Sequence, residues 1–201
     1  MAEEGNSLIW PCLAPDESCF VVFRRSQNIK REAQDRWDHP LKGIISLDAP
    51  WRISFPDGFG MPTNMTVMAL APWKELGPTL EAKAFSGTAT YETDFNVYSS
   101  SPVSIRTLCL GRVDSIAKVT LNGKTYPTIW APPYSVDVTD AVKFGMNHLK
   151  IEVTDTWFNR MAYDSGVPEP KRRTWAFRRP RKTEPLHDSG LIGPVEILSY
   201  K

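Results

Sequence analysis

The chain has 201 residues, of which 41% are hydrophobic and 23% are charged, and its formal net charge at pH 7 is +1. These values exclude a largely disordered chain and a global field that would attract nucleic acid or an anionic membrane. No apolar run approaches the roughly 20 residues of a membrane-spanning helix, so we expect neither a nucleic-acid partner nor a membrane span. The length predicts one well-buried domain with an appendage.

The first segment predicts one strand and a connector. The apolar run Cys19–Phe23 is followed by a polar stretch from Arg24 to Lys42 that has no clear period. We therefore expect residues 1–46 to hold the tail strand of a preceding β domain and a connector, and residues 47–201 to form the main domain. The start has no basic region followed by an apolar one, which predicts no secretion signal in the chain as given.

From Leu47 onward, short alternating runs are separated by turn residues. In WRISFP, Trp51, Ile53 and Phe55 share one face, as in a half-buried strand. The same alternation continues along residues 87–97, 117–126, 148–153 and 193–200. Between two of these runs stands Asn122-Gly123, a dipeptide that tolerates the positive φ angles of a tight hairpin turn.

The pattern as a whole predicts an all-β fold. No segment has a sustained apolar stripe of helical period, and the 17 prolines would interrupt most helices. We therefore predict an antiparallel β-sandwich or jelly roll with long loops. The stretch from Arg160 to Pro194 is rich in Pro and Arg and does not alternate, which indicates a functional excursion or a wrapping loop.

Cysteine and histidine spacing gives no sign of a disulfide framework or a zinc site. Cys12, Cys19 and Cys109 are odd in number and contain no CxxC pair, and the three histidines are scattered. We interpret the cysteines as ordinary thiols.

Several motifs, taken in order, resemble the galactose-binding-like β-sandwich of glycoside hydrolase family 2. They are FSGTATY (85–91), LGRV (110–113), AKVTLNGK (117–124), WAPPY (130–134) and VDVT (136–139). Other stretches resemble the carboxy-terminal end of the family 106 α-L-rhamnosidases. They are LAPDESCFVVFRR (13–25), NHLKIEV (147–153), TWFNR (156–160) and SGLIGPV (189–195).

This resemblance implies a non-catalytic domain of a larger, rhamnosidase-like enzyme. The catalytic carboxylates of such enzymes lie on a separate barrel domain, so no catalytic residue is carried over to this chain. Hydrolysis of a glycoside needs two facing carboxyl groups, and nothing in the sequence marks two of its many acids as such a pair. The resemblance also implies a parent protein in the periplasm, at the cell surface or secreted.

A structural calcium ion is common in jelly rolls of this kind. Glu196, near the last predicted strand, is the candidate carboxylate for it, although no Asp-rich ligand run accompanies it. We expect no other cofactor.

The first candidate glycan site is the cluster that follows the strand HLKIEV. Trp157 offers a flat apolar face for a sugar ring, while Asn159, Arg160 and Asp164 offer orienting hydrogen bonds. The structural alternative is that Trp157 plugs one end of the sandwich and that Arg160 pins the long loop through Asp164 or carbonyl groups. Contact with the catalytic domain of the parent enzyme is a third possibility.

The second candidate is the 130–134 loop, where two prolines hold Trp130 and Tyr134 in a rigid, extended segment. The alternative is that Tyr134 begins the next strand and packs inward, with Trp130 covering a sheet edge.

The third candidate is residues 171–182, KRRTWAFRRPRK, in which seven basic residues surround Trp175 and Phe177. This composition suits an acidic polysaccharide or a nucleic-acid backbone. The alternative is a solvated loop whose arginines pair with acids of the sandwich or of a neighbouring domain.

The sequence thus predicts a non-catalytic, carbohydrate-binding-like accessory domain that supports the catalytic domain. We expect the loops 130–134, 157–164 and 171–182 to form one rim that holds the glycan. Its predicted partners are the catalytic domain and a rhamnose- or galactose-containing glycan, with an acidic polysaccharide as the alternative glycan. The rival hypotheses are a purely structural domain without sugar affinity and a free-standing lectin-like module.

Overall fold

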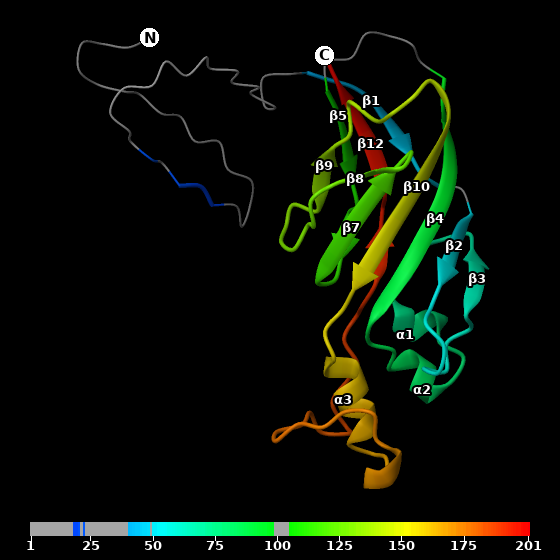
Figure 1. The fold of residues 1–201 in the computed structure, drawn as a ribbon, viewed down its shortest axis with the longest axis vertical. Helices are drawn as coiled ribbons and strands as arrows, with labels where there is room; N and C mark the ends of the chain where they lie inside the picture. The colour runs from blue at the N-terminus through cyan, green and yellow to red at the C-terminus, as the bar shows by residue number, and fades with distance from the viewer. Residues whose placement is uncertain (1–17, 21, 23–39, 49, 99–104) are drawn as a thin grey trace.

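The computed structural model of the chain describes residues 18–20, 22, 40–48, 50–98 and 105–201. Strands in these ranges form two main antiparallel sheets that share one hydrophobic core (Figure 1). The predicted all-β, antiparallel sandwich is therefore confirmed. None of the helices in these ranges is long and apolar enough to cross a membrane.

The larger sheet has six strands in the order β3-β2-β4-β10-β7-β8. Their bounds are β2 Trp51–Ser54, β3 Asn64–Val67, β4 Thr88–Val97, β7 Ile116–Leu121, β8 Lys124–Thr125 and β10 Gly145–Thr154. Strands β4 and β10 pair along their full length and form its centre. Their alternate residues are buried, as the period-2 pattern predicts, because only one face of the sheet meets the core.

The smaller sheet has four strands in the order β1-β12-β5-β9, and a separate pair joins β6 to β11. Their bounds are β1 Leu41–Ser46, β5 Ile105–Cys109, β6 Arg112–Val113, β9 Ser135–Asp137, β11 Leu191–Gly193 and β12 Glu196–Tyr200. Strand β1 occupies residues that the sequence placed in the connector, and it pairs with β12. Most of its residues are exposed, so it carries no alternating pattern to reveal it.

The hairpin between β7 and β8 confirms the turn predicted at Asn122-Gly123. These residues have φ angles of +51° and +86°. Positive φ at both central residues is the requirement of the tight hairpin turn that matches strand twist.

An aromatic cluster closes the core at the end where β4 begins. Trp73 and Phe55 meet Phe85 edge to face, with ring centroids 4.8 and 5.2 Å away. The indole Nε1 of Trp73 donates a hydrogen bond to Tyr91 Oη over 2.5 Å, and the backbone N of Leu191 donates a second over 3.1 Å. Burial raises the pKa of Tyr91 to about 12, so its oxygen stays a neutral acceptor for both.

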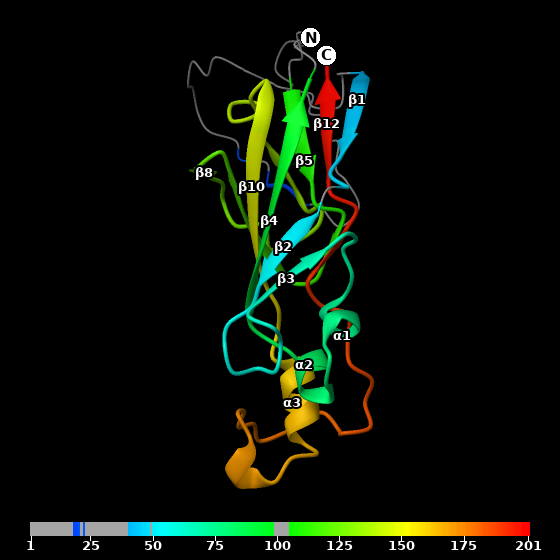
Figure 2. The same ribbon diagram turned by 90° about the vertical axis from the view of Figure 1, so that its right-hand side faces the viewer.

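Three short helices gather at this end, away from the end where the C-terminus lies (Figures 1 and 2). They are α1 Trp73–Leu76, α2 Leu80–Lys83 and α3 Phe158–Asp164, followed by the 3-10 turn Glu169–Lys171. At four to seven residues they are too short to show a helical period, which is why the sequence analysis did not predict them.

The strand predicted at Cys19–Phe23 is only partly within the described residues. Residues 18–20 and 22 are described and lie in no strand, and Phe20 and Val22 are exposed. Residues 21 and 23, like Cys12, lie outside the described residues. The division of the chain at residues 46 and 47 stays a prediction.

Candidate functional site

Helix α3 is fixed to the returning chain by Asn159. The amide Nδ2 of Asn159 donates to the carbonyl of His187 over 3.0 Å, and its Oδ1 accepts from the backbone N of His187 over 2.8 Å. The ring of Phe158 stacks on that of His187 with centroids 3.8 Å apart. The Asn159 side chain is buried, and both the nitrogen and the oxygen of its amide are hydrogen-bonded. It therefore links α3 to the segment that leads into β11.

Arg160 is the centre of a buried polar cluster. Its Nε donates to Asp164 Oδ1 and its Nη1 donates to Glu81 Oε1 of α2, both over 3.1 Å. Its guanidinium carbon lies 5.1 and 5.9 Å from the ring centroids of Tyr163 and Phe59. The two carboxylates and the two aromatic faces compensate the burial of the charge.

Asp164 connects this cluster to the long loop. Its Oδ2 accepts hydrogen bonds from the backbone N of Arg173 over 2.9 Å and of Thr174 over 2.7 Å, and from Thr174 Oγ1 over 2.8 Å. Burial favours the neutral acid, but these bonds and the charge of Arg160 outweigh it and lower the pKa of Asp164 below its ordinary value. The ionised carboxylate therefore organises the loop around itself.

These contacts place three of the candidate residues inside the molecule. Asn159, Arg160 and Asp164 are buried, and their polar groups bind other parts of the chain. The expected pinning of the loop through an Arg160–Asp164 ion pair is confirmed. Because these three side chains are buried, a glycan cannot reach them directly in this arrangement.

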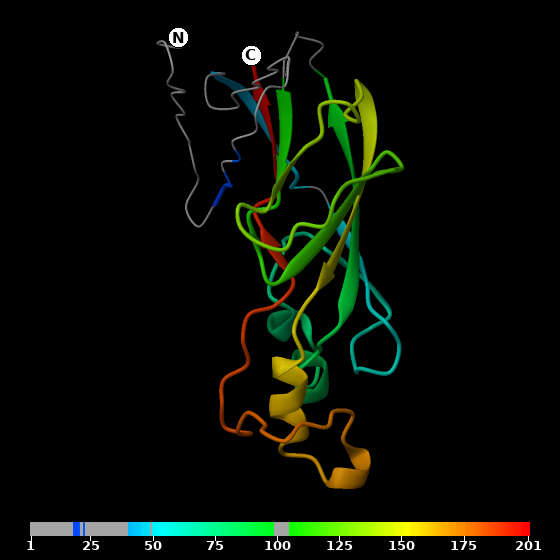
Figure 3. The same ribbon diagram turned by 60° about the vertical axis from the view of Figure 1, so that its left-hand side comes forward.

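Trp157 and Trp175 keep exposed surface at the same end of the molecule. Trp157 is 46% exposed and its other part faces Phe59, at a ring-centroid distance of 6.2 Å. Trp175 is 82% exposed and lies in the segment 171–182, named here the basic loop. Figure 3 shows that segment, in orange, beside α3 at the tip of the molecule.

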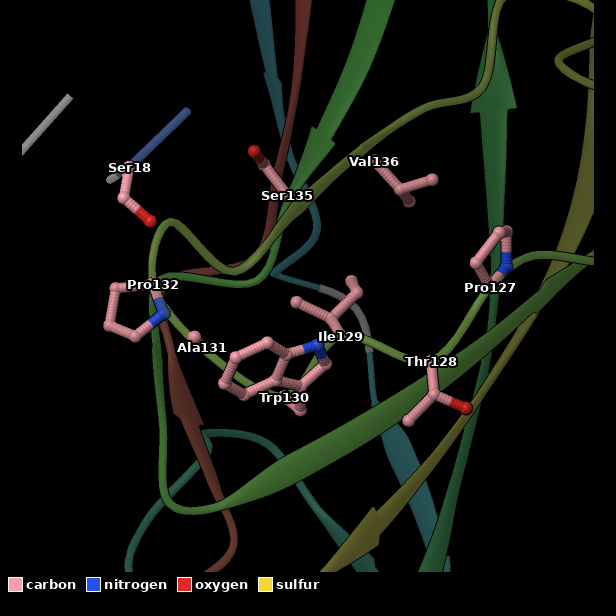
Figure 4. Close-up of a pocket in the computed structure, with 9 residues that line it drawn as sticks. All are labelled: Ser18, Pro127, Thr128, Ile129, Trp130, Ala131, Pro132, Ser135 and Val136. Carbon is pink, nitrogen blue, oxygen red and sulfur yellow. The ribbon is translucent and has the colours of Figure 1, made fainter. Parts of the chain in front are cut away.

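The 126–136 segment forms a second surface, named here the Trp130 pocket. Trp130 is 76% exposed and contributes to a hollow of about 380 Å³ that is also lined by Pro127, Thr128, Pro132 and Ser135, and by Ser18 from the N-terminal part of the chain. Figure 4 shows the indole between Pro132 on one side and Thr128 on the other. This volume is within the range of about 300–1,000 Å³ that is usual for small-ligand pockets.

Tyr134 anchors the 126–136 segment to the body of the domain. Its ring packs against the core, and its Oη donates to the carbonyl of Ser115 over 2.9 Å. Burial and the nearby charge of Asp114 raise the pKa of Tyr134, which keeps its hydroxyl a donor. Tyr134 thus packs inward, as one of the two sequence interpretations predicts, while Trp130 stands in solvent.

The three loops predicted to share one rim lie in two places. The bonds of Asp164 bring α3 and the basic loop together. The 126–136 segment lies beside the strands rather than at the tip, in all three ribbon views (Figures 1, 2 and 3). The structure therefore offers two separate candidate surfaces.

Sequence reasoning did not single out Glu81, Phe59 or the environment of Asp155. Glu81 is 79 residues from Arg160, its bonding partner, so no local spacing signals the pair. Asp155 is only 6% exposed, and burial together with the charge of Asp114 raises its pKa to about 6. Its Oδ1 accepts hydrogen bonds from Ser115 Oγ and from the backbone N of Thr156.

Glu196 lies on β12, where Ser46 Oγ donates to its Oε1 over 3.4 Å. In the described ranges, no group of three or more His, Cys, Asp and Glu side chains is placed to hold a metal ion. Glu196 and Ser46 offer few oxygen atoms for calcium, which takes six to eight oxygen ligands. A calcium ion at Glu196 stays a prediction.

Comparison with known proteins places the chain among domains of sugar-cleaving enzymes. Residues 80–185 match the family described as glycosyl hydrolase 2 galactose-binding domain-like. A protein of Formosa agariphila described as a putative beta-glucuronidase is 33% identical over 179 residues, which cover 76% of this chain and 15% of that protein.

Two solved structures share the fold. A rhamnosidase from Novosphingobium sp. PP1Y matches with a TM-score of 0.71 at 34% identity over 88% of this chain and 17% of that chain. A Ruminococcus gnavus beta-glucuronidase matches with a TM-score of 0.58 at 16% identity over 78% of this chain and 28% of that chain, a similarity of fold alone. The chain thus spans only a small part of the length of these relatives.

Proposed function

Because this chain belongs to the glycosyl hydrolase 2 galactose-binding-domain-like family, we propose that it is a non-catalytic accessory domain of a glycoside hydrolase that holds neutral sugar residues at the Trp130 pocket. The observation that carries this proposal is the exposed indole of Trp130 in a preformed hollow. An indole offers a flat apolar face to the C–H face of a sugar ring, and it loses little conformational entropy on binding. Thr128 and Ser135 supply hydroxyl groups at the same hollow.

The rigidity of the pocket supports the proposal. Ile129, next to Trp130, exchanges two backbone hydrogen bonds of 2.8 Å with Ala117, the second residue of strand β7. The bond from Tyr134 to Ser115 holds the other end of the loop. A pocket that is fixed before the sugar arrives requires less ordering on binding, which favours affinity for a small ligand.

We propose further that the parent enzyme resembles the family 106 α-L-rhamnosidases and that its catalytic carboxylates lie in another domain. The rhamnosidase match at 34% identity supports this assignment. The relative from Formosa agariphila is described as a putative beta-glucuronidase, at a similar identity of 33%. The substrate of the parent enzyme is therefore either a rhamnoside or a glucuronide. Release of nitrophenol from nitrophenyl rhamnoside or glucuronide by this chain alone would contradict the non-catalytic role.

Calorimetric titration with L-rhamnose, D-galactose and neutral oligosaccharides that contain them tests the proposal. Trp130→Ala removes the indole, and Trp175→Ala is the matched control because it removes an equally exposed indole at the other surface. We expect saturable binding that Trp130→Ala abolishes and Trp175→Ala leaves unchanged. Circular dichroism establishes that both variants are folded.

The second candidate function is a purely structural domain that supports the catalytic domain without sugar affinity. The burial and internal bonding of Asn159, Arg160 and Asp164 favour it, because the polar groups of these three residues stabilise the tip and are not free to bind a ligand. No saturable heat with any neutral glycan, from a folded chain, would select this function over the first.

A further inference from the structure

The basic loop concentrates positive charge at the tip of the molecule. Residues 171–182 contain seven Lys and Arg residues and no acidic residue, whereas the whole chain has a net charge of only +1. Acidic residues elsewhere therefore balance this charge overall but do not remove it locally. Such a local field attracts anions to this one surface.

Three of the arginines hold the shape of the loop. Arg172 Nε donates to the carbonyl of Val167 over 2.7 Å, and Arg179 Nη2 donates to the carbonyl of Thr174 over 3.2 Å. Arg173 Nε lies 3.7 Å from Glu81 Oε1, and the guanidinium carbon of Arg173 lies 5.0 Å from the centroid of the Phe59 ring. Together with the hydrogen bonds that Asp164 accepts from the loop backbone, these contacts hold the 173–179 segment without using the remaining basic residues.

The remaining side chains are presented to solvent. Trp175 and Phe177 are 82% and 90% exposed. Within the described part of the chain, the side chains of Lys171, Arg178, Arg181 and Lys182 make no hydrogen bond or ion pair, and all four residues are exposed. The loop thus displays two aromatic faces and four unpaired cations on a fixed backbone. The packing of the domain accounts for the exposure of neither the aromatic side chains nor the cations.

We propose that the basic loop is a second binding site, which takes acidic glycans built from uronic acid units. Arginine binds a carboxylate through two parallel charge-assisted hydrogen bonds, and a sugar ring stacks its C–H face on an aromatic side chain. A polymer that repeats a carboxylate and a ring complements a surface that interleaves cations with aromatic side chains. The choice of a glycan over another polyanion rests on the proposed function, since stacking and charge alone also suit single-stranded nucleic acid.

The test uses the 201-residue chain and two oligosaccharides of equal length, an oligogalacturonide and a neutral galacto-oligosaccharide. The double variant Arg178→Gln/Arg181→Gln removes two unpaired cations of the loop. The control Lys118→Gln/Lys143→Gln removes the same net charge from exposed positions on and near the larger sheet. Trp175→Ala tests the stacking face.

We expect the oligogalacturonide to bind, with affinity that falls as salt is raised. The loop double variant should weaken it about tenfold or more, which corresponds to about 1.4 kcal/mol, and the control by less than about twofold. Trp175→Ala should weaken it about fivefold or more, because it removes the aromatic face on which a sugar ring stacks. Equal losses in the loop variant and the control would overturn the proposal, as would tighter binding of a single-stranded oligonucleotide of the same charge.

Failure of this proposal is distinguishable from failure of the proposed function. If neutral sugars bind through Trp130 but the oligogalacturonide does not bind, the acidic site is refuted and the accessory sugar-binding role stands. If the oligogalacturonide binds through the loop while no neutral sugar binds, the Trp130 pocket is refuted instead.

Discussion

Replacing Asp155 with Asn should stabilise this domain at neutral pH but not at acidic pH. Asp155 is buried at the end of β10, and its pKa is raised from 3.8 to about 6, first by burial and also by the charge of Asp114. The folded state therefore binds the proton of Asp155 more tightly than the unfolded state does. Asp155 therefore does not lower the free energy of unfolding below about pH 4. It lowers this free energy as pH rises from about 4 to about 6, and the free energy stays lower above that range.

The size of this loss follows from the shift. Each pKa unit corresponds to about 1.4 kcal/mol, so a shift of about two units costs about 3 kcal/mol of unfolding free energy above pH 6. Asparagine removes the buried charge and keeps an Oδ1 that accepts the bonds from Ser115 Oγ and the backbone N of Thr156. Asp155→Asn should therefore be about 2–3 kcal/mol more stable than the unaltered chain at pH 8, relative to their difference at pH 4.

Urea unfolding at pH 4 and pH 8, followed by tryptophan fluorescence, measures this difference. Asp48→Asn, at an exposed position, is the control and should follow the unaltered chain within about 0.5 kcal/mol at both values. A difference between Asp155→Asn and the unaltered chain that does not change with pH would refute the reasoning.

Three further predictions concern the buried contacts of the tip. Asp164→Asn should destabilise the domain by about 2–4 kcal/mol, because it removes one of the two carboxylates that compensate the buried charge of Arg160. It should also speed tryptic cleavage in the basic loop, and an unchanged cleavage rate would contradict the role of Asp164 in ordering the loop. Tyr91→Phe should cost about 2–5 kcal/mol in urea unfolding, since it leaves the buried donors Trp73 Nε1 and Leu191 N without an acceptor. Gly190→Ala should cost about 1–3 kcal/mol, because Gly190 has φ +96° and an added Cβ would lie 2.5 Å from Trp73 Nε1; a neutral effect would show that the aromatic cluster yields easily.

The sandwich could be predicted from the sequence where one face of a strand is buried. Trp51, Ile53 and Phe55 alternate with polar residues, and all three lie in the core. Strand β1 and the helices could not be predicted in this way, because β1 is mostly exposed and the helices span two turns or fewer. Edge strands and single turns are specified by contacts with distant segments, which leave no local period.

The candidate site was predictable as residue types but not as an arrangement. The cluster Trp157–Asp164 reads as a polar ligand platform, yet Arg160 is buried because Glu81 and Phe59 arrive from a distant part of the chain. The Arg160–Asp164 pair was accessible to sequence reasoning from its opposite charges, while the helix that brings the two side chains to one face was not predicted. The separation of the Trp130 pocket from the tip depends on the course of the 126–136 segment and had no signal in the sequence.

The central claim, that the domain holds a neutral sugar at the Trp130 pocket, is tested most directly by nuclear magnetic resonance of the indole N–H groups. The chain has seven tryptophans, and the variants Trp130→Ala and Trp175→Ala assign the signals of these two. Titration with rhamnose- or galactose-containing oligosaccharides should shift the Trp130 signal progressively and to saturation, while the signals of Trp175 and of buried Trp51 and Trp73 stay in place. A Trp130 signal that does not move at saturating oligosaccharide would contradict the claim and leave the structural role as the function of this domain.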